Sequence, residues 1–318
     1  MDDATRDVTN NEVTSKEAAR IEKQRIKDLI AETHAPSPFK IFWGELKKDK
    51  LAMFCLFFFV TVIVTVFVWA ATFDVLDVVR PHLRYRNTPP GPGFPLGADP
   101  AGRDVLPLLI VGARNSFLIA FVIAILTSVI GVAVGLAAGF YGGHVDNVVM
   151  RILDFFTMIP TLMITIMLIT LLESTVVNFA LVLTIFAWIG MARVIRMVTL
   201  QQGVMDYVKA SKTLGTRNIV IIFREVVPNI ISFMVVNLTL TFAGLIGVEL
   251  GLTILGFGFS QHIPSIGTLV AYAMDPVSME RRYWQWLPAA LFILVMVLCI
   301  NYVGQALNRA ADARRRRM

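Results

Sequence analysis

The stretch LAMFCLFFFVTVIVTVFVWAATF, Leu51–Phe73, decides the fold of this chain. It contains no Asp, Glu, Lys or Arg. An α-helix rises about 1.5 Å per residue, so a helix over this stretch would reach roughly 34 Å. The hydrocarbon core of a bilayer is about 30 Å thick, and the stretch therefore predicts a helix that crosses a membrane with some tilt.

Five further apolar runs follow along the chain, and one of them, Leu153–Leu172, contains a single charged side chain, Asp154. They are Phe117–Phe140, Leu153–Leu172, Val177–Met191, Ile230–Val248 and Leu287–Leu307. The run Val177–Met191 is short, and we expect its helix to continue to Leu200 with Arg193 and Arg196 at the level of the headgroups. The composition agrees, because 56% of the residues are hydrophobic and only 16% are charged. The predicted fold class is an all-α integral membrane protein with six transmembrane helices.

The distribution of Lys and Arg predicts the orientation in the membrane. With the N-terminus inside, 22 of the 29 Lys and Arg lie in inner segments and seven lie outside. Cytoplasmic loops carry the excess of positive charge, so both termini are predicted to be cytoplasmic. The net charge of +6 could also suggest a nucleic-acid partner. We expect none, because the basic residues bracket the apolar runs and do not form a patch.

The segments outside the spans divide the chain into three parts. The polar tail is predicted to be cytoplasmic and partly helical, either as a solvated helix or with a docking role, and it shows no cleavable signal. Phe39, Phe42, Trp43 and Leu46 have the spacing of an interfacial helix that lies on the inner leaflet before the first span. In chain order the predicted parts are the tail 1–38, the six-helix domain 39–310 with outer loop 74–116 and inner loop 201–229, and the basic tail 311–318.

The outer loop contains a sequence typical of a helix start. Asp99 is a good N-cap and Pro100 a good first helical residue. We therefore expect a short helix here, bent near Pro107.

The inner loop 201–229 is expected to form a small two-helix protrusion. Asp206 can cap the first helix, and Gly215 is suited to end it in a left-handed conformation. The second helix is expected to end at Pro228. Small side chains near Ala210 would let the protrusion enter a groove on a soluble partner. An ordinary structured loop explains the same residues equally well.

At this loop the sequence resembles a known family. The run Tyr207-Val208-Lys209-Ala210-Ser211, with Gly215 and Val227-Pro228-Asn229 further on, is similar to the EAA loop of ABC-importer permeases. In that family the loop forms a coupling helix that docks on an ATP-hydrolysing subunit. The resemblance implies this coupling role for Asp206, Lys209, Ala210, Ser211, Leu214, Gly215 and Pro228.

Further matches resemble the oligopeptide, dipeptide and nickel group of that family, specifically its C-type peptide permease subunit. They run in the family's order from about Phe39 to Ala310. They are Leu96–Val105, Gly112–Ser116, Gly139–Asp146, Met150–Asp154, Ile159-Pro160, and Glu249 followed by Leu252–Gly258.

Three departures from the family pattern concern specificity. Lys209 stands where the loop usually opens with Glu, so the charge offered to the partner is reversed and the partner surface is expected to carry a compensating acid. Ser265-Ile266 stands where the family commonly has Trp beside Gly267. Gln305 and Asn308 replace an acid and a base near the end of the last span.

The resemblance implies a permease of a prokaryotic cell membrane that forms half of a translocation pathway. Its expected partners are a sister permease in a heterodimer, two ATP-binding subunits, an extracytoplasmic solute-binding protein, the peptide substrate and the lipid bilayer. Oligopeptides are favoured, because the outer loop is long and the spans lack acidic or histidine-rich stretches. Dipeptides and nickel chelates remain alternatives, and a secondary transporter driven by an ion gradient is the alternative from another class.

No enzymatic or metal chemistry is expected in this chain. No GxxxxGK[ST] loop occurs, and the four His residues do not cluster with Cys or carboxylates at metal-ligand spacing. Cys55 and Cys299 lie inside apolar runs and predict no disulfide. We therefore expect no catalytic residue, metal or cofactor here, and ATP with Mg²⁺ in the partner subunits.

Three charged residues are candidates at the outer side. Glu249 is expected near the outer face, either as a structural ion pair with Arg103 or Arg114, or as a gate and counter-charge for a peptide amine. On the second interpretation, Glu249→Gln lowers uptake without affecting assembly. Arg103 and Asp104 are expected to orient the outer loop or to dock the binding protein.

Overall fold

The structure is a computed structural model that describes residues 44, 46–172, 175–259 and 262–315. The predicted tail 1–38 lies outside the described residues, and so do Phe39, Phe42 and Trp43 of the predicted interfacial helix. All the regular elements of the described part are helices, and its loops contain two isolated β-bridges.

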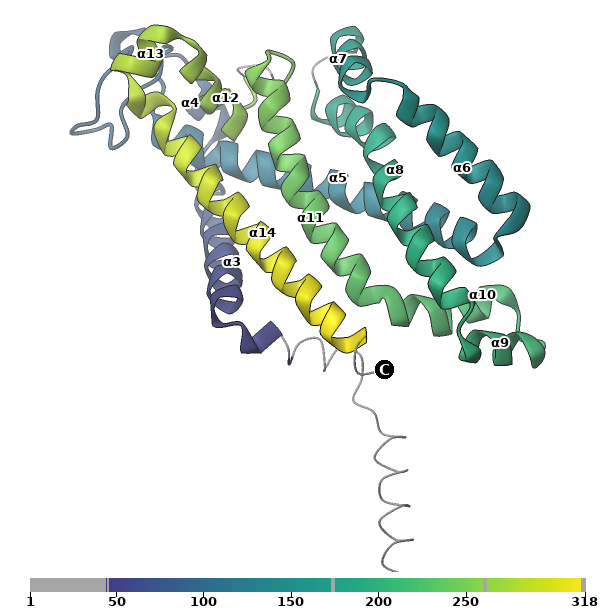
Figure 1. Cartoon of the computed structure of the whole chain (residues 1–318). Coiled ribbons are helices and arrows are strands. Elements are labelled where there is room, and N and C mark those ends of the chain that lie inside the picture. The colour runs from purple at the N-terminus through teal and green to yellow at the C-terminus, as the bar shows by residue number, and fades with distance from the viewer. Residues whose placement is uncertain (1–43, 45, 173–174, 260–261, 316–318) are drawn as a thin grey trace, which may run out of the picture. The chain divides into compact units, whose positions relative to one another are not determined.

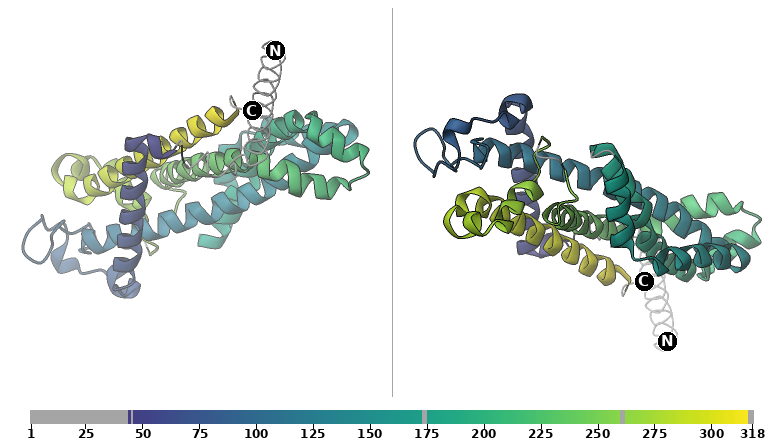
Figure 2. Two further views of the ribbon diagram at one scale, coloured as in Figure 1. Left: turned by 90° about the horizontal axis from the view of Figure 1, so that it is seen from below. Right: turned by 90° about the horizontal axis from the view of Figure 1, so that it is seen from above.

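Five long helices form the frame of the bundle (Figure 1). They are α3 (Lys50–Ala70), α5 (Val105–Tyr141), α8 (Val176–Gly203), α11 (Val227–Ile254) and α14 (Leu287–Arg315). Shorter elements connect them: α4 (Val75–Val79), η1 (Leu83–Tyr85), α6 (Gly143–Met158), α7 (Thr161–Leu171), α9 (Asp206–Thr213), α10 (Asn218–Ile221), η2 (Ile222–Val226), α12 (Ile266–Val270), η3 (Ala271–Met274), α13 (Pro276–Arg281) and η4 (Tyr283–Gln285). Figures 1 and 2 show α3 and α6 at opposite edges of this bundle.

The predicted all-α membrane fold is confirmed. Within the described residues, five helices are long and apolar enough to cross a membrane, and there are six spans if the bent pair α6 and α7 counts as one. The third predicted span, Leu153–Leu172, is not a straight helix, because α6 and α7 are bent by 75°. Pro160 explains the bend. It has no N–H to donate, and it keeps the preceding Ile159 extended, with φ −84° and ψ 130°.

The second span begins earlier than predicted, at Val105 and not at Phe117. Its N-cap is Asp104, whose carboxylate accepts a hydrogen bond of 3.0 Å from the backbone N–H of Leu106. The predicted short helix capped by Asp99 does not form. The Asp99 carboxylate instead closes a turn, because it accepts backbone hydrogen bonds from two residues that follow it, Ala101 and Arg103.

Glycines bring α5 and α8 into close contact. Gly131, Gly135 and Gly139 recur every four residues along one face of α5. A Cβ atom at Gly135 would lie 2.6 Å from the backbone oxygen of Ala192 in α8, which is inside van der Waals contact. These three positions form the glycine seam, a small-residue contact of the kind that lets membrane helices approach each other closely.

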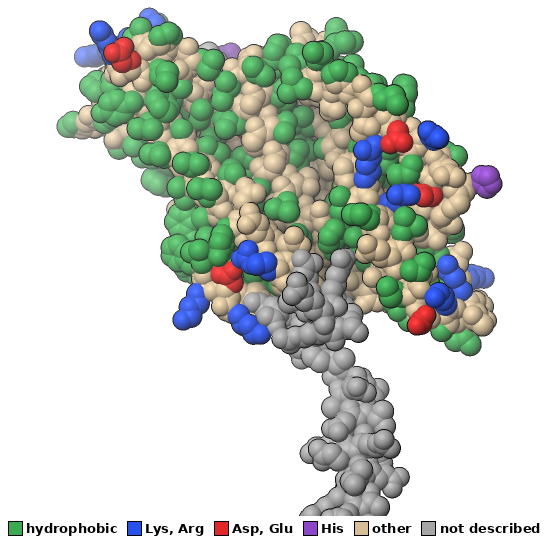
Figure 3. All heavy atoms as spheres, in the orientation of Figure 1, with side chains coloured by type: hydrophobic (Ala, Val, Ile, Leu, Met, Phe, Trp, Pro, Cys, Tyr) green, Lys and Arg blue, Asp and Glu red, His purple; other side chains and the backbone are tan. Residues whose placement is uncertain are grey.

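The bundle has two ends that differ in structure (Figure 1). The start of α3, the end of α14 and the short helices α9 and α10 lie at one end, which we call the α9 end. The other end, which we call the α13 end, carries α4, α12 and α13. On the face drawn in Figure 3, charged side chains gather at these ends and over α6 and α8, and the middle of the face is uncharged.

Candidate functional site

The short helix α9 has a defined stop. Gly215 follows it with φ +76°, which confirms the predicted left-handed terminator. The N–H of Gly215 donates to the oxygen of Lys212 at 3.0 Å, and the N–H of Thr216 donates to that of Ser211 at 3.1 Å. These two bonds make a Schellman motif, which satisfies the last carbonyl groups of α9.

The start of α9 differs from the prediction. Met205 occupies the N-cap position, and Asp206 is the first helical residue, so the predicted cap by Asp206 is wrong. Met205 is the extended residue because α8 continues through Gly203 and leaves a tight connection between the two helices. The exposed Asp206 carboxylate lies 3.3 Å from the Lys209 ammonium. Asp206 also faces the positive end of the helix dipole, where a negative charge is favourable.

Two contacts hold α9 to the long helices. Val208 is fully buried in a cluster that includes Ile195 of α8. Ser211 donates a hydrogen bond of 2.5 Å to Glu225 in the segment that leads into α11. Ala210 is exposed, and Leu214 at the tip is 83% exposed. The protrusion is thus fixed at its base and apolar at its free end.

The segment after α9 does not end at Pro228 as predicted. It continues without interruption into α11, so that one helix runs over Asn218–Ile254. The π-helical turn η2 makes this possible, because the N–H of Val227 donates to the oxygen of Ile222, five residues earlier. Such a widened turn keeps the proline ring away from the preceding carbonyl groups. The side-chain amide of Asn229 donates to the backbone oxygen of Glu225 at 2.8 Å.

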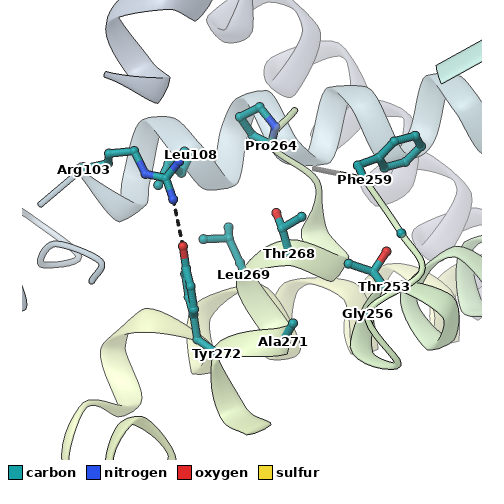
Figure 4. Close-up of a pocket in the computed structure, with 11 residues that line it drawn as sticks. Arg103, Leu108, Thr253, Gly256, Phe259, Pro264, Thr268, Leu269, Ala271 and Tyr272 are labelled. Carbon is teal, nitrogen blue, oxygen red and sulfur yellow. Dashed lines mark hydrogen bonds between the residues drawn. The ribbon is translucent and has the colours of Figure 1, made fainter. Parts of the chain in front are cut away.

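At the α13 end, Arg103 lies in a buried polar cluster. Its side chain is 6% exposed and donates to Asp99 at 2.7 Å and to the hydroxyl of Tyr272 at 2.9 Å (Figure 4). Tyr272 in turn donates to Asp99 at 3.0 Å. Burial by itself would lower the pKa of Arg103, but Tyr272 and Asp99 outweigh it and raise that pKa. Arg103 therefore ties the loop before α5 to η3 as a cation.

Asp104, the neighbour of Arg103, orients the loop in a different way. Its carboxylate caps α5, and burial raises its pKa. The two adjacent residues thus act through separate partners, Arg103 through Asp99 and Tyr272 and Asp104 through the helix start. Both contacts support the predicted role in orienting the loop, and docking of a binding protein at these residues stays a prediction.

Glu249 lies inside the bundle and is 2% exposed. Its carboxylate accepts hydrogen bonds of 3.1 Å from the hydroxyls of Ser116 in α5 and Thr253 in α11. Ser116 also accepts a bond of 3.1 Å from the N–H of Ile266, the first residue of α12. Glu249 therefore joins three helices through hydroxyl groups.

The ion pair predicted for Glu249 is not formed with either arginine. Arg103 is bonded to Asp99 and Tyr272, and the side chain of Arg114 donates to Asn115. Arg114 does not reach Glu249 because it lies two residues before Ser116 on α5. Ser116 points at Glu249, and residues two apart on a helix point in different directions. The gate role of Glu249 stays a prediction.

A cavity of about 240 Å³ lies beside this cluster (Figure 4). It is enclosed by the loop before α5 and by residues of α11, α12 and η3, including Arg103, Thr253, Thr268 and Tyr272. Ligand sites usually have volumes of about 300–1,000 Å³, so we assign it no ligand. In the described part of the chain, no three His, Cys, Asp or Glu side chains are placed to hold a metal ion.

Two ion pairs between α6 and α8 were missed from the sequence. Arg196 binds Asp146, and Arg193 binds Asp154 at 2.8 Å and also Thr157. We expected these arginines only at the headgroup level. Asp146 and Asp154 both belong to family motifs given above, which marked them as candidates for a contact. The sequence did not identify the arginines as their partners, because these lie far along the chain.

A bundle of long apolar helices, with the short helix α9 held at one end by Val208 and Ser211, is the structure of a multi-pass membrane protein. Residues 131–317 match the family model described as binding-protein-dependent transport system inner membrane component. Residues 37–90 match that of the N-terminal TM domain of oligopeptide transport permease C. The chain belongs to the family of binding-protein-dependent transport system inner membrane components, and it is a multi-pass protein of the cell membrane.

Individual relatives agree with this assignment. The chain is 40% identical over 272 residues to the oligopeptide transport system permease protein OppC of Lactococcus lactis subsp. lactis. The aligned region covers 85% of this chain and 92% of that protein. It is 34% identical over 278 residues to the dipeptide transport system permease protein DppC of Bacillus subtilis, with 86% and 85% covered. Among solved structures, an inward-facing MetNI methionine ABC transporter matches with a TM-score of 0.51 at 21% identity, over 64% of this chain and 96% of that chain. This last likeness bears on the fold alone.

Proposed function

We propose that this chain is the C-type permease subunit of an ATP-driven importer of oligopeptides. Its similarity to oligopeptide permeases over most of its length supports the substrate class. In this proposal it pairs with a sister permease and forms half of the translocation pathway. Two ATP-binding subunits supply the energy and hold ATP and Mg²⁺, and an extracytoplasmic solute-binding protein delivers the peptide.

The observation that carries the proposal is the way in which α9 is attached. Val208 packs into a cluster with Ile195 of α8, and Ser211 is bonded to Glu225 at the base of α11. A force on the exposed tip at Leu214 would therefore reach two long helices at once. Packed interiors shift between discrete arrangements and do not deform continuously, so such a force can change access to the pathway.

The proposed coupling also predicts which side of the membrane α9 faces. ATP-binding subunits are cytoplasmic, and the α9 end would therefore lie inside, together with the start of α3 and the end of α14 (Figure 1). The excess of Lys and Arg in the segments at this end supports the same orientation. Both chain termini would then be cytoplasmic.

A substitution at the free tip of the protrusion tests the proposal. Leu214→Asp changes a side chain that is 83% exposed, so we expect the fold to survive. In the complete transporter in proteoliposomes, we expect ATP-dependent uptake of an oligopeptide to fall by about tenfold or more. A loss of roughly 1.4 kcal/mol of coupling or docking free energy is enough for that effect. Leu214→Met, which keeps an apolar tip, is the matched control.

Three outcomes would contradict the proposal or narrow it. Normal uptake by Leu214→Asp would show that force does not enter through α9. Uptake driven by an ion gradient without ATP would favour a secondary transporter. Because the chain is also similar to a dipeptide permease, dipeptides and nickel chelates should be offered in competition, and either one displacing the oligopeptide would correct the substrate class.

A further inference from the structure

A second and larger cavity opens between α7, α8 and α11. Its volume is about 520 Å³, and none of the side chains that line it is charged. Volumes of about 300–1,000 Å³, mostly apolar walls and a few polar groups are typical of ligand sites. Figure 3 shows no acidic or basic side chain over the adjoining parts of α7 and α11 on the face drawn.

Three glycines form one wall of this cavity. Gly244, Gly247 and Gly251 share a face of α11, and a Cβ atom at any of them would meet no atom within 4 Å. They differ in this respect from the glycine seam of α5, where a Cβ atom would overlap α8. Glycine inside a helix is destabilising relative to alanine. In α11 it leaves space open and does not allow close packing with a neighbouring helix.

A hydroxyl with no hydrogen bond to a described residue lines the same cavity. Thr165 of α7 is 4% exposed, and its side-chain hydroxyl makes no hydrogen bond to any other residue that the structure describes. Thr170 and Thr184, by contrast, donate to backbone oxygens four residues earlier, at 2.8 and 2.7 Å. The hydroxyl of Thr165 is therefore available to a molecule that enters the cavity.

We propose that this cavity receives a bulky apolar side chain of the transported peptide and that the Thr165 hydroxyl bonds to the peptide backbone beside it. A peptide carries apolar side chains and backbone hydrogen-bonding groups next to each other, which matches an apolar cavity whose hydroxyl groups come from Thr161 and Thr165 of α7. A lipid chain would leave the Thr165 hydroxyl unpaired. Acidic and basic side chains would lose hydration there without gaining a partner. This inference rests on the proposed import of peptides.

The open glycine wall permits a sharp test of the cavity. Gly247→Leu fills the cavity, and Gly190→Leu is the matched control, because Gly190 also lies in a helix with no atom within 4 Å of its Cβ position but does not line the cavity. The complete transporter in proteoliposomes is given penta-alanine or the same peptide with a central phenylalanine. We expect Gly247→Leu to slow the phenylalanine peptide at least about tenfold more than penta-alanine, because the filled cavity has no room for the phenylalanine ring. We expect Gly190→Leu to leave the ratio of the two rates unchanged.

The hydroxyl is tested separately from the volume. Thr165→Val keeps the shape of the side chain and removes its hydroxyl. Because the bond is to backbone that both peptides share, we expect the KM to rise roughly fivefold for both, which corresponds to one ordinary hydrogen bond. Thr165→Ser should restore the wild-type KM.

The outcomes separate this inference from the proposed function. Equal slowing of both peptides by Gly247→Leu, or loss of the sister permease from the complex, would show that the cavity is a general passage or a subunit contact and would overturn the inference. An unchanged KM in Thr165→Val would remove the role of the hydroxyl. If wild-type transporter takes up neither peptide with ATP, the proposed function fails first.

Discussion

At the scale of single residues, Glu249 shows how a buried acid can be held without a cation. Its carboxylate accepts hydrogen bonds from the hydroxyls of Ser116 and Thr253. The Ser116 hydroxyl in turn accepts a hydrogen bond from the backbone N–H of Ile266. Hydrogen bonds to a carboxylate are stronger than those between neutral groups. The arrangement therefore favours a structural role, in which Glu249 fastens α5 and α12 to α11.

Substitutions at Glu249 distinguish the structural role from a gate role. Glu249→Ala would leave the hydroxyl of Ser116 without its acceptor and create a cavity, whereas Thr253 would still donate to the backbone oxygen of residue 249. We expect a loss of about 2–4 kcal/mol in stability. Glu249→Gln keeps the volume and an acceptor oxygen, and we expect it to assemble with nearly normal thermal stability. Uptake measured per assembled complex should then stay close to that of the wild type. A fully assembled Gln variant with poor uptake would instead support the gate role.

At the scale of elements, the same residue type serves opposite purposes in two helices. The glycine seam, Gly131, Gly135 and Gly139, lets α5 touch the backbone of α8. Gly244, Gly247 and Gly251 of α11 leave an open face. The two sets differ only in what lies opposite them.

The glycine seam predicts a large difference between two formally identical substitutions. Gly135→Val would place a Cβ atom 2.6 Å from the backbone oxygen of Ala192, which cannot move aside easily. We expect overpacking of about 1–3 kcal/mol or more and a clear fall in the thermal midpoint of the purified subunit. Gly190→Val, for which the space is open, is the control and should be tolerated. Equal tolerance at both positions would mean that α5 and α8 do not pack as described.

At the scale of the whole described bundle, Asp49 connects the beginning of the helical frame to its end. It caps α3 through the N–H of Ala52 at 3.1 Å, and it accepts a hydrogen bond of 2.8 Å from Arg309 of α14. Tyr302 lies close by, with its hydroxyl 3.4 Å from the carboxylate. The backbone N–H of Ala52 and the side chain of Arg309 lower the pKa of Asp49 below its ordinary value of 3.8.

This connection predicts a pH dependence with a definite sign. A carboxylate whose folded-state pKa is lowered contributes stability above its ordinary pKa and loses it as the pH falls through the lowered value. We therefore expect the wild type to have a higher melting temperature than Asp49→Asn at neutral pH. The difference between the two melting temperatures should vanish as the pH drops below 3.8. Thermal unfolding of both proteins across this range measures the effect. A gap that does not depend on pH would show that the charge of Asp49 is not what matters.

The orientation of the molecule can be tested by labelling single cysteines. Both natural cysteines, Cys55 and Cys299, are buried and should react little with a membrane-impermeant maleimide. In intact cells we expect the reagent to label Met279→Cys in α13, where the side chain is 59% exposed, and not Ala210→Cys. After permeabilisation both should react. Labelling of Ala210→Cys from outside would invert the proposed orientation and remove the basis for coupling through α9.

Local chemistry was sufficient to predict much of this molecule. Long apolar runs identify the spans, because a bilayer penalises charged side chains, and Asp154 is the one exception within the six runs. Gly215 marks the end of α9, because a left-handed backbone conformation favours glycine. The same local patterns gave wrong positions for one helix end and one helix cap, because these depend on competition between neighbouring residues. Pro228 does not stop a helix that can widen into a π-turn, and Asp104 and not Asp99 caps α5.

What only the tertiary structure decided is which groups meet across long separations in the chain. Ser116 reaches Glu249 across 133 residues, and no local pattern distinguishes that partner from the nearby arginines. The open wall at Gly247 and the closed seam at Gly135 are equally invisible in sequence, since a glycine carries no side chain whose character could reveal its surroundings. The physical reason is the range of the forces: hydrophobicity and backbone preference act on each residue where it stands, whereas packing and hydrogen bonding depend on the neighbours that folding brings together.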